Sequence, residues 1–193
     1  MDTYQRVFDK HKYDLNMRYR SQAWFQQQVL LLSKERITPN KLVKDSASQN
    51  RAQIIPGNLY LYAYDPKYKD TLPYYDRYPL VFPFKKTEGG FIGLNMHYLA
   101  YPLRIKLLDR LQQFRSNDKM DGNTKLKLSW QLIDGVSRFS LAKPCVKHYL
   151  LPHVRSQFVK INSKDWATAM LMPVERFVGS TKDQVWRDSL GKI

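Results

Sequence analysis

Residues 56–66 read PGNLYLYAYDP, and residues 78–84 read YPLVFPF. In the first stretch, leucine or alanine at positions 59, 61 and 63 alternates with tyrosine at positions 60, 62 and 64, which is the period-two pattern of a β-strand. Pro56-Gly57 predicts a turn before this strand. Asp65-Pro66 ends it, because proline cannot donate a hydrogen bond to a neighbouring strand.

The second stretch predicts a strand of a different kind. It is apolar throughout but contains Pro79 and Pro83, which restrict it to an edge or to a bent barrel strand. The glycines of Glu88-Gly89-Gly90 can take positive φ, so residues 81–85 and 91–95 are predicted to form a hairpin. Three short, aromatic, proline-bounded strands predict an α+β fold with a small SH3-like or OB-like β-barrel at its core.

Helical patterns flank this β unit. Apolar periodicity predicts helices at residues 18–34, 38–42, 102–114, 124–136, 143–151 and 181–190, and alternation predicts one more strand at 154–161.

We expect two parts of the chain. The first, residues 1–53, contains an extended arm at 1–16, a helix, and a polar linker at 44–53. The second, residues 54–193, is an α+β core domain, in which the β unit of residues 54–99 precedes a helical remainder at 100–193.

Composition limits the class of protein. Of the 193 residues, 43% are hydrophobic, which is enough for a packed core. Cys145 is the single cysteine, so no internal disulfide can form, and we expect a reducing compartment. No apolar run approaches the 18 or so residues of a membrane span, so no membrane partner is expected. The net charge of +15 predicts a polyanion or an acidic protein surface as partner.

No motif predicts catalysis. The chain contains no Gly-rich phosphate loop, HExxH, GxSxG or CxxC sequence. Cys145 lies three residues from His148, but one thiol and one imidazole do not make a four-ligand zinc site, so a structural role is favoured. His97 follows the best strand, where a structural histidine is favoured over a phosphate ligand.

Carboxylates are the remaining candidates for a metal site. Asp65, Asp70 and Asp76 flank the loop after the first strand and in principle can hold magnesium. Prolines stand beside them, which favours turn-forming aspartates instead. We therefore predict no catalytic residue, no metal and no cofactor.

Tyrosines and basic residues mix in the same loop. Such a mixture can stack bases and neutralise phosphates, but it is also typical of protein interfaces. Acidic residues accompany the basic ones, which favours the protein interface. The candidate partner-interface residues are Trp24, Tyr60, Tyr62, Tyr64, Tyr74, Tyr75 and Arg77. The candidate DNA-binding residues are Lys67, Lys69, Lys85, Lys86 and Arg104.

Several motifs together carry a family resemblance. They are IPGNLY at 55–60, YDPK at 64–67, DTLPYYDR at 70–77, GLNMHYL at 93–99, PCVK at 144–147 and PVERF at 173–177. Through these motifs, the chain resembles virion structural and assembly proteins of contractile-tailed, T4-like bacteriophages, and the resemblance covers most of residues 20–189. The resemblance implies a virion protein assembled in the host cytoplasm, in several copies, among other virion proteins. Similar proteins include baseplate or tail-assembly parts and DNA end protectors.

Two non-enzymatic functions follow. In the first, the protein is a structural adaptor of the tail, baseplate or neck that bridges neighbouring subunits. In the second, it binds the terminus of packaged duplex DNA. The polar arm of residues 1–16 favours the first, because such arms order against partners. The net charge favours the second, and we rank the adaptor above the DNA end protector.

Overall fold

The computed structural model describes residue 43, residues 50–51 and residues 53–191. The predicted arm at 1–16, the helix at 18–34 with Trp24, and the turn at 38–42 lie outside these residues. The strands are β1 (Asn50–Arg51), β2 (Leu59–Leu61), β3 (Tyr75–Asp76), β4 (Leu80–Thr87), β5 (Gly90–Asn95), β6 (Val146–Leu150), β7 (Phe158–Ile161) and β8 (Phe177–Val178). The α-helices are α4 (Tyr101–Arg115), α5 (Gly122–Val136), α6 (Trp166–Leu171) and α7 (Lys182–Gly191), and the 3₁₀ helices are η3 (Met96–Tyr98), η4 (Ser140–Cys145), η5 (Leu151–His153) and η6 (Ser163–Asp165).

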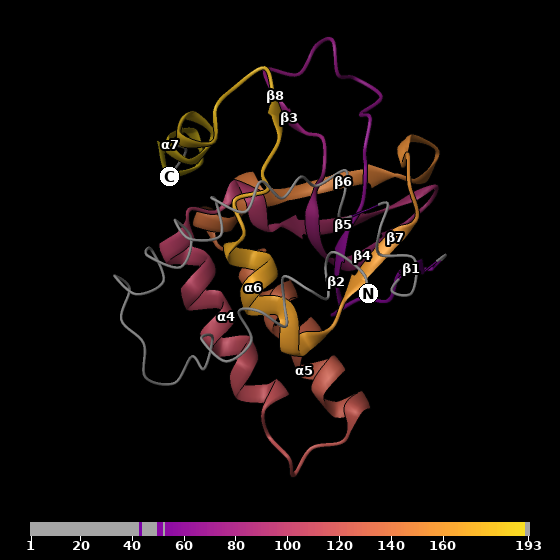
Figure 1. The fold of residues 1–193 in the computed structure, drawn as a ribbon, viewed down its shortest axis with the longest axis vertical. Coiled ribbons are helices and arrows are strands. Elements are labelled where there is room, and N and C mark those ends of the chain that lie inside the picture. The colour runs from indigo at the N-terminus through magenta and orange to yellow at the C-terminus, as the bar shows by residue number, and fades with distance from the viewer. Residues whose placement is uncertain (1–42, 44–49, 52, 192–193) are drawn as a thin grey trace.

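One antiparallel sheet organises the described residues, with the strand order β1-β7-β2-β4-β5-β6, while β3 pairs separately with β8 (Figure 1). The predicted hairpin is confirmed as β4 and β5. Gly89 in its turn has a φ of 68°, which favours glycine. Asn50–Arg51, at the end of the predicted linker, instead forms β1 and pairs with β7.

The helical predictions hold in three places and fail in one. The predictions at 102–114, 124–136 and 181–190 correspond to α4, α5 and α7. The predicted helix at 143–151 is wrong, because Val146–Leu150 pairs with β5 as strand β6. This long-range pairing overrides the local helical spacing. No helix among the described residues is long and apolar enough to cross a membrane.

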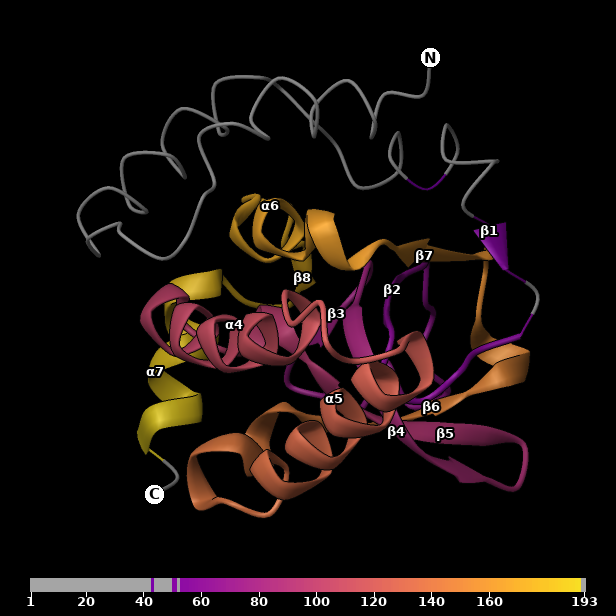
Figure 2. The same ribbon diagram turned by 90° about the horizontal axis from the view of Figure 1, so that it is seen from below.

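Helices cover one face of the sheet. Helices α4, α5 and α6 gather on this face (Figures 1 and 2). The larger core cluster lies between them and the sheet, and includes Leu59, Leu61 and Phe82. Phe82 is fully buried, and its ring meets that of Trp166 edge-on at a centroid distance of 4.9 Å. The structure therefore confirms a mixed α and β fold.

The opposite face of the sheet is concave and surrounds a second core cluster, which is mainly aromatic; we call this concave face the curl of the sheet. The cluster contains Ile54, Tyr60, Tyr62, Tyr64, Val81, Phe91, Tyr149 and Phe158. The ring of Tyr62 lies 4.9 Å from that of Phe158 on β7 and 5.6 Å from that of Tyr149 on β6. Four strand spacings separate β7 from β6, which amounts to about 19 Å in a flat sheet. The sheet must therefore be strongly curved for both rings to contact one tyrosine.

This curvature bears on two of the sequence-based predictions. Tyr60 and Tyr62 were predicted to face a partner, but they fill the inside of the curl and are buried. The sheet also remains open among the described strands, where β1 and β6 are its two edges. These strands form no closed barrel, and the predicted SH3-like or OB-like core is not confirmed, although the strong curvature of the sheet accounts for the barrel-like sequence pattern.

Replacing Phe82 with alanine is expected to lower the free energy of unfolding by about 3–5 kcal/mol, because it opens a cavity beside Trp166. Chemical denaturation of the two proteins measures the difference. Phe139→Ala is the matched control, since that ring is 66% exposed and should change stability by less than about 0.5 kcal/mol. Equal effects of the two substitutions would contradict this core.

Candidate nucleic-acid interface

The loop between β2 and β3 projects from one end of the sheet, at the top of Figure 1. Both of its ends are fixed by backbone hydrogen bonds. Tyr64 N donates to Arg77 O at 3.0 Å, and Asp65 N donates to His153 O at 3.0 Å. The hydroxyl of Tyr64 accepts a hydrogen bond from Leu150 N at 3.1 Å. The loop is therefore held against the segment that follows β6.

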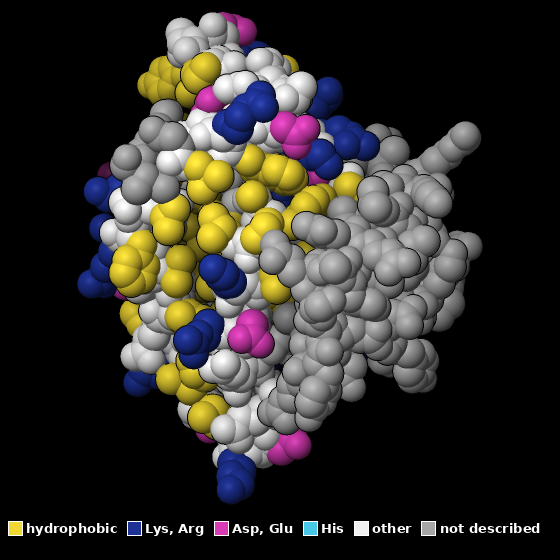
Figure 3. Space-filling view, turned by 90° about the vertical axis from the view of Figure 1, so that its left-hand side faces the viewer, with side chains coloured by type: hydrophobic (Ala, Val, Ile, Leu, Met, Phe, Trp, Pro, Cys, Tyr) yellow, Lys and Arg dark blue, Asp and Glu magenta, His cyan; other side chains and the backbone are white. Residues whose placement is uncertain are grey.

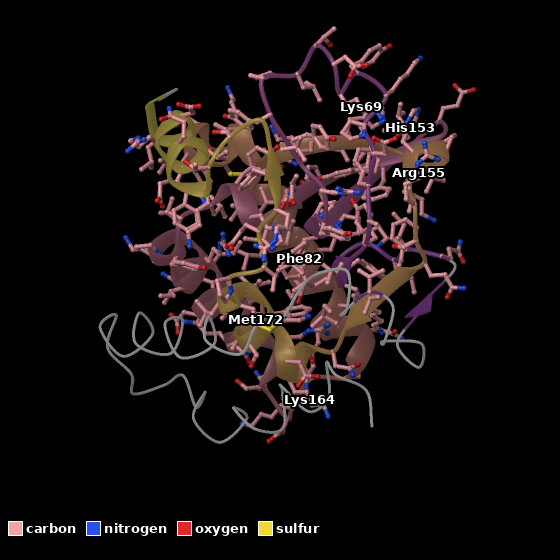
Figure 4. All side chains as sticks on the ribbon, turned by 45° about the horizontal axis from the view of Figure 1, so that its top comes forward. Lys69, Phe82, His153, Arg155, Lys164 and Met172 are labelled. Atoms are coloured by element: carbon pink, nitrogen blue, oxygen red, sulfur yellow. The ribbon has the colours of Figure 1, made fainter. Side chains whose placement is uncertain are left out.

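Basic side chains meet around Asp65 at this end of the sheet. Lys69 Nζ lies 3.1 Å from Asp65 Oδ1, and Arg155 Nη2 lies 3.6 Å from Asp65 Oδ2. His153 Nδ1 lies 2.9 Å from the backbone oxygen of Asp65. Figure 4 shows Lys69, His153 and Arg155 close together. The hydrogen bond from Lys69 lowers the pKa of Asp65, so this carboxylate is ionised and offsets one of the two cations.

Further basic residues lie across the sheet, on the hairpin of β4 and β5. Lys85 pairs with Ile92, which pairs with His148, so Lys85 and His148 lie two strand spacings apart, about 10 Å. At the hairpin turn, Leu151 N donates to Gly89 O at 2.9 Å, which joins the turn to the segment that leads to Arg155. We define the basic band as the exposed residues Lys67, Lys69, Lys85, Lys86, His148 and Arg155. Lys85 and Lys86 are consecutive residues of β4, so their side chains extend on opposite sides of the hairpin.

Beside the basic band lies a pocket of about 290 Å³, between the β2–β3 loop and β6, an edge strand of the described sheet. We call it the tyrosine pocket. Its lining includes Tyr64, Tyr68, Tyr74, Tyr75, Tyr98 and Tyr149, with Lys67, Leu72, Asp76 and Lys147 among the other residues. Lys147 Nζ stands 4.1 Å from the ring centroid of Tyr98, and Lys67 Nζ stands 5.2 Å from that of Tyr68.

The floor of the tyrosine pocket is fixed by buried polar groups. Asp76 Oδ2 accepts a hydrogen bond from Asn95 Nδ2 at 3.0 Å and lies 2.8 Å from His97 Nδ1. Asn95 Nδ2 also donates to the hydroxyl of Tyr149 at 3.0 Å. His97 is fully buried beside Asp76, while its Nε2 has no hydrogen-bond partner among the described residues, so the structural role stays a prediction.

Arg104 corrects another prediction. It was a candidate DNA-binding residue, but it is fully buried. Its Nη2 lies 2.6 Å from Glu175 Oε1, and its other nitrogens donate to backbone oxygens: Nε to Leu99 at 2.7 Å and Nη1 to Met170 at 2.9 Å. It lies on the buried side of α4, where a guanidinium is tolerated because it is paired and hydrogen-bonded.

The residues predicted from the sequence for a partner interface or for DNA binding thus fall in different places in the structure. Tyr64, Tyr74 and Tyr75 line the tyrosine pocket, and Arg77 is exposed at the end of β3. All four predicted lysines lie in the basic band. The sequence did not predict three residues of the pocket, Lys147 and Tyr149 of β6 and Tyr98 of η3. For the two residues of β6, the wrong helix prediction at 143–151 conceals the alternation of the strand. Trp24 lies outside the described residues.

Cys145, Asp65 and Asp76 lie in different surroundings. Burial raises the pKa of the Cys145 thiol to about 12, so it stays protonated, which agrees with its predicted structural role. Among the described residues, no group of three or more His, Cys, Asp or Glu side chains is placed to hold a metal ion. Asp65 pairs with Lys69, while Asp76 is buried against His97.

Comparison with known proteins gives one family. A family model described as the phage T4 terminal DNA protecting protein matches residues 10–189. No curated protein and no solved structure gives a significant match.

Replacing Glu175 with glutamine leaves Arg104 buried without its counter-charge, and should cost about 3–5 kcal/mol of stability at pH 7. Burial is the largest single influence and raises the pKa of Glu175, but the Arg104 guanidinium, His97 and the hydrogen bonds to the carboxylate together lower it by more, so this pKa lies below the ordinary 4.5. This carboxylate therefore stabilises the fold fully above about pH 4.5, and its contribution is lost as the pH falls through the folded-state pKa.

Denaturant unfolding between pH 7 and pH 3 tests this dependence. The difference between the wild type and Glu175→Gln should be constant down to about pH 5 and shrink below about pH 4.5. Asp109→Asn, at an exposed carboxylate of α4, is the control and should stay within about 0.5 kcal/mol of the wild type at neutral pH. A difference that grows on acidification would refute the stabilising role of this ion pair.

Proposed function

This chain belongs to the family of the phage T4 terminal DNA protecting protein, since that family's model matches residues 10–189, and we propose that it binds the ends of phage duplex DNA in the virion. The sequence alone ranked this function second, behind a tail or baseplate adaptor. The family match favours the DNA reading. Its name identifies DNA termini as what a member of the family protects.

The observation that carries the proposal is the convergence of the basic band. Lys67 and Lys69 come from the β2–β3 loop, Lys85 and Lys86 from the hairpin, and Arg155 from the segment before β7. These three segments are far apart in the sequence and adjacent at one end of the sheet. A band of exposed cations neutralises phosphates and releases counterions, which is the main source of sequence-independent affinity for DNA.

A second surface supports an additional role in bridging virion neighbours. A groove of about 280 Å³ runs between α4 and α5, and Figure 3 shows hydrophobic side chains gathered on the face that bears α4. Leu103, Leu107 and Phe139 line the groove, together with Lys106 and Arg110. This combination suits an amphipathic helix with acidic residues along its flank. The adaptor function thus remains a second proposal, compatible with DNA binding.

Binding to linear blunt duplex and to closed circular duplex at about 0.15 M salt tests the main proposal. We expect tighter binding to linear DNA, with log affinity falling by about 0.9 per neutralised phosphate against log salt. The double variant Lys67→Glu with Lys69→Glu should weaken binding about tenfold or more and reduce the salt slope by about 2.

Lys164→Glu is the matched control. Lys164 is an exposed lysine of η6, and Figure 4 shows it at the opposite end of the molecule from Lys69, with Phe82 between them. This variant should bind linear DNA like the wild type. Equal affinity of the wild type for linear and closed circular DNA would contradict end binding, and equal losses in both variants would contradict the basic band.

We further propose that the protein holds DNA ends without cutting them. Asp65 pairs with Lys69 and Asp76 with His97, and the described residues contain no group of three or more His, Cys, Asp or Glu side chains that could hold a metal ion such as catalytic magnesium. Linear and single-stranded DNA incubated with protein and Mg²⁺, Mn²⁺ or Zn²⁺ should remain full length on denaturing gels. Metal-dependent cleavage that disappears in Asp65→Asn or Asp76→Asn would disprove this.

A further inference from the structure

The tyrosine pocket has two zones of different chemistry. Its interior is formed by aromatic rings, including those of Tyr74, Tyr98 and Tyr149, and by the apolar side chain of Leu72. Positive charge stands beside these rings, because Lys147 lies over Tyr98 and Lys67 over Tyr68. A ligand that matches both zones has a flat apolar part and a negative part. A nucleotide has this combination, with a base that stacks on tyrosine and a phosphate that pairs with lysine.

One wall of the pocket is rigid. Tyr149 and Tyr98 are buried, and the hydroxyl of Tyr149 accepts a hydrogen bond from Asn95. Tyr64 is held by its bond from Leu150. This wall therefore needs little ordering when a ligand binds, which favours affinity. The rings that remain open to a stacked base are those of Tyr68, which is exposed, and of Tyr74 and Tyr75, which are half-buried.

The other wall is formed by the β2–β3 loop. Tyr68 on this loop is 61% exposed, and its side chain makes no hydrogen bond to the rest of the loop, although its backbone oxygen accepts bonds from Thr71 and Leu72. Its ring can therefore cover an inserted base without breaking a contact that holds the fold. Of the six tyrosines in the pocket, Tyr68 is thus the one whose loss should change binding and leave the fold intact.

At a DNA end, a base can leave the duplex and enter the pocket at a lower free-energy cost than anywhere else along the duplex. An interior base is paired and stacked on both sides, whereas a terminal base is stacked on one side only, so its extrusion costs less. We infer that the tyrosine pocket receives the terminal base of one DNA strand, while lysines at its rim contact the adjoining phosphate. This inference rests on the proposed end binding and gives it a source of selectivity, because the basic band alone recognises phosphates anywhere along a duplex.

Fluorescence of 2-aminopurine tests the inference. The probe is placed either at the terminal position or in the interior of a duplex whose other end is closed by a hairpin. Binding of the full-length protein should change the emission of the terminal probe and leave that of the interior probe unaltered. Tyr68→Ala should abolish the change and weaken binding to the open end about 5- to 150-fold, the range expected for one stacked base. Tyr68→Phe keeps the ring and should behave like the wild type.

The outcomes separate this inference from the proposed function. Suppose that the wild type prefers linear over closed circular DNA, but Tyr68→Ala keeps that preference and the terminal probe does not respond. End binding then stands, and the pocket is not its source. If the wild type binds linear and closed circular DNA equally well, both the proposed end binding and the assignment of the pocket to a terminal base are overturned.

A free nucleotide is the other source of the same ligand chemistry. Deoxyadenosine monophosphate should compete with the terminal probe only at concentrations far above those of the DNA ends. Competition at equal concentrations would overturn the assignment of the pocket to a DNA terminus. Tyr68→Ala should bind closed circular DNA as the wild type does, which shows that the basic band is intact in this variant.

Discussion

The buried guanidinium of Arg104 connects the parts of the fold that carry the candidate interface. Its Nη2 pairs with Glu175, which lies just before β8, and also donates to His97 O at 3.2 Å. Further bonds reach Leu99 at the start of α4 and Met170 in α6. The helical face and the polar floor of the tyrosine pocket therefore share one cation. A buried charge of this kind is costly to leave unpaired, so these segments are expected to hold together or fail together.

Curvature of the sheet decides which aromatic residues are available to a ligand. Tyr60 and Tyr62 are buried in the interior of the curl and are not available to a ligand. Tyr64 lies where the curl ends, with one side in the aromatic cluster and the other against the tyrosine pocket. Beyond it, the β2–β3 loop carries the exposed Tyr68 beside the basic band, while Tyr74 lines the pocket and packs against Tyr98 and Phe177. A single tyrosine-rich segment thus supplies both a core and a binding surface.

The sequence predicted local structure well and tertiary relations less well. Turn glycines such as Gly89 and the apolar spacing of α4 and α5 are local signals, so the hairpin and these helices could be predicted. The position of Arg104 could not, because its counter-charge is 71 residues away in sequence. Likewise, β6 pairs with β5, whose residues lie between 52 positions (Leu94 with Val146) and 60 positions (Gly90 with Leu150) earlier in the sequence, and only that pairing places Lys147 and Tyr149 in the pocket.

Protection of DNA ends is the central claim, and exonuclease digestion measures it most directly. Linear duplex is treated with a double-strand-end-dependent exonuclease, with and without the protein, beside a nicked circle treated with an exonuclease that starts at nicks. We predict that the protein blocks digestion of the linear duplex at about one protein per end, while digestion of the nicked circle proceeds at its usual rate. Inhibition of both substrates to the same degree, or only when protein coats the whole duplex, would contradict end recognition.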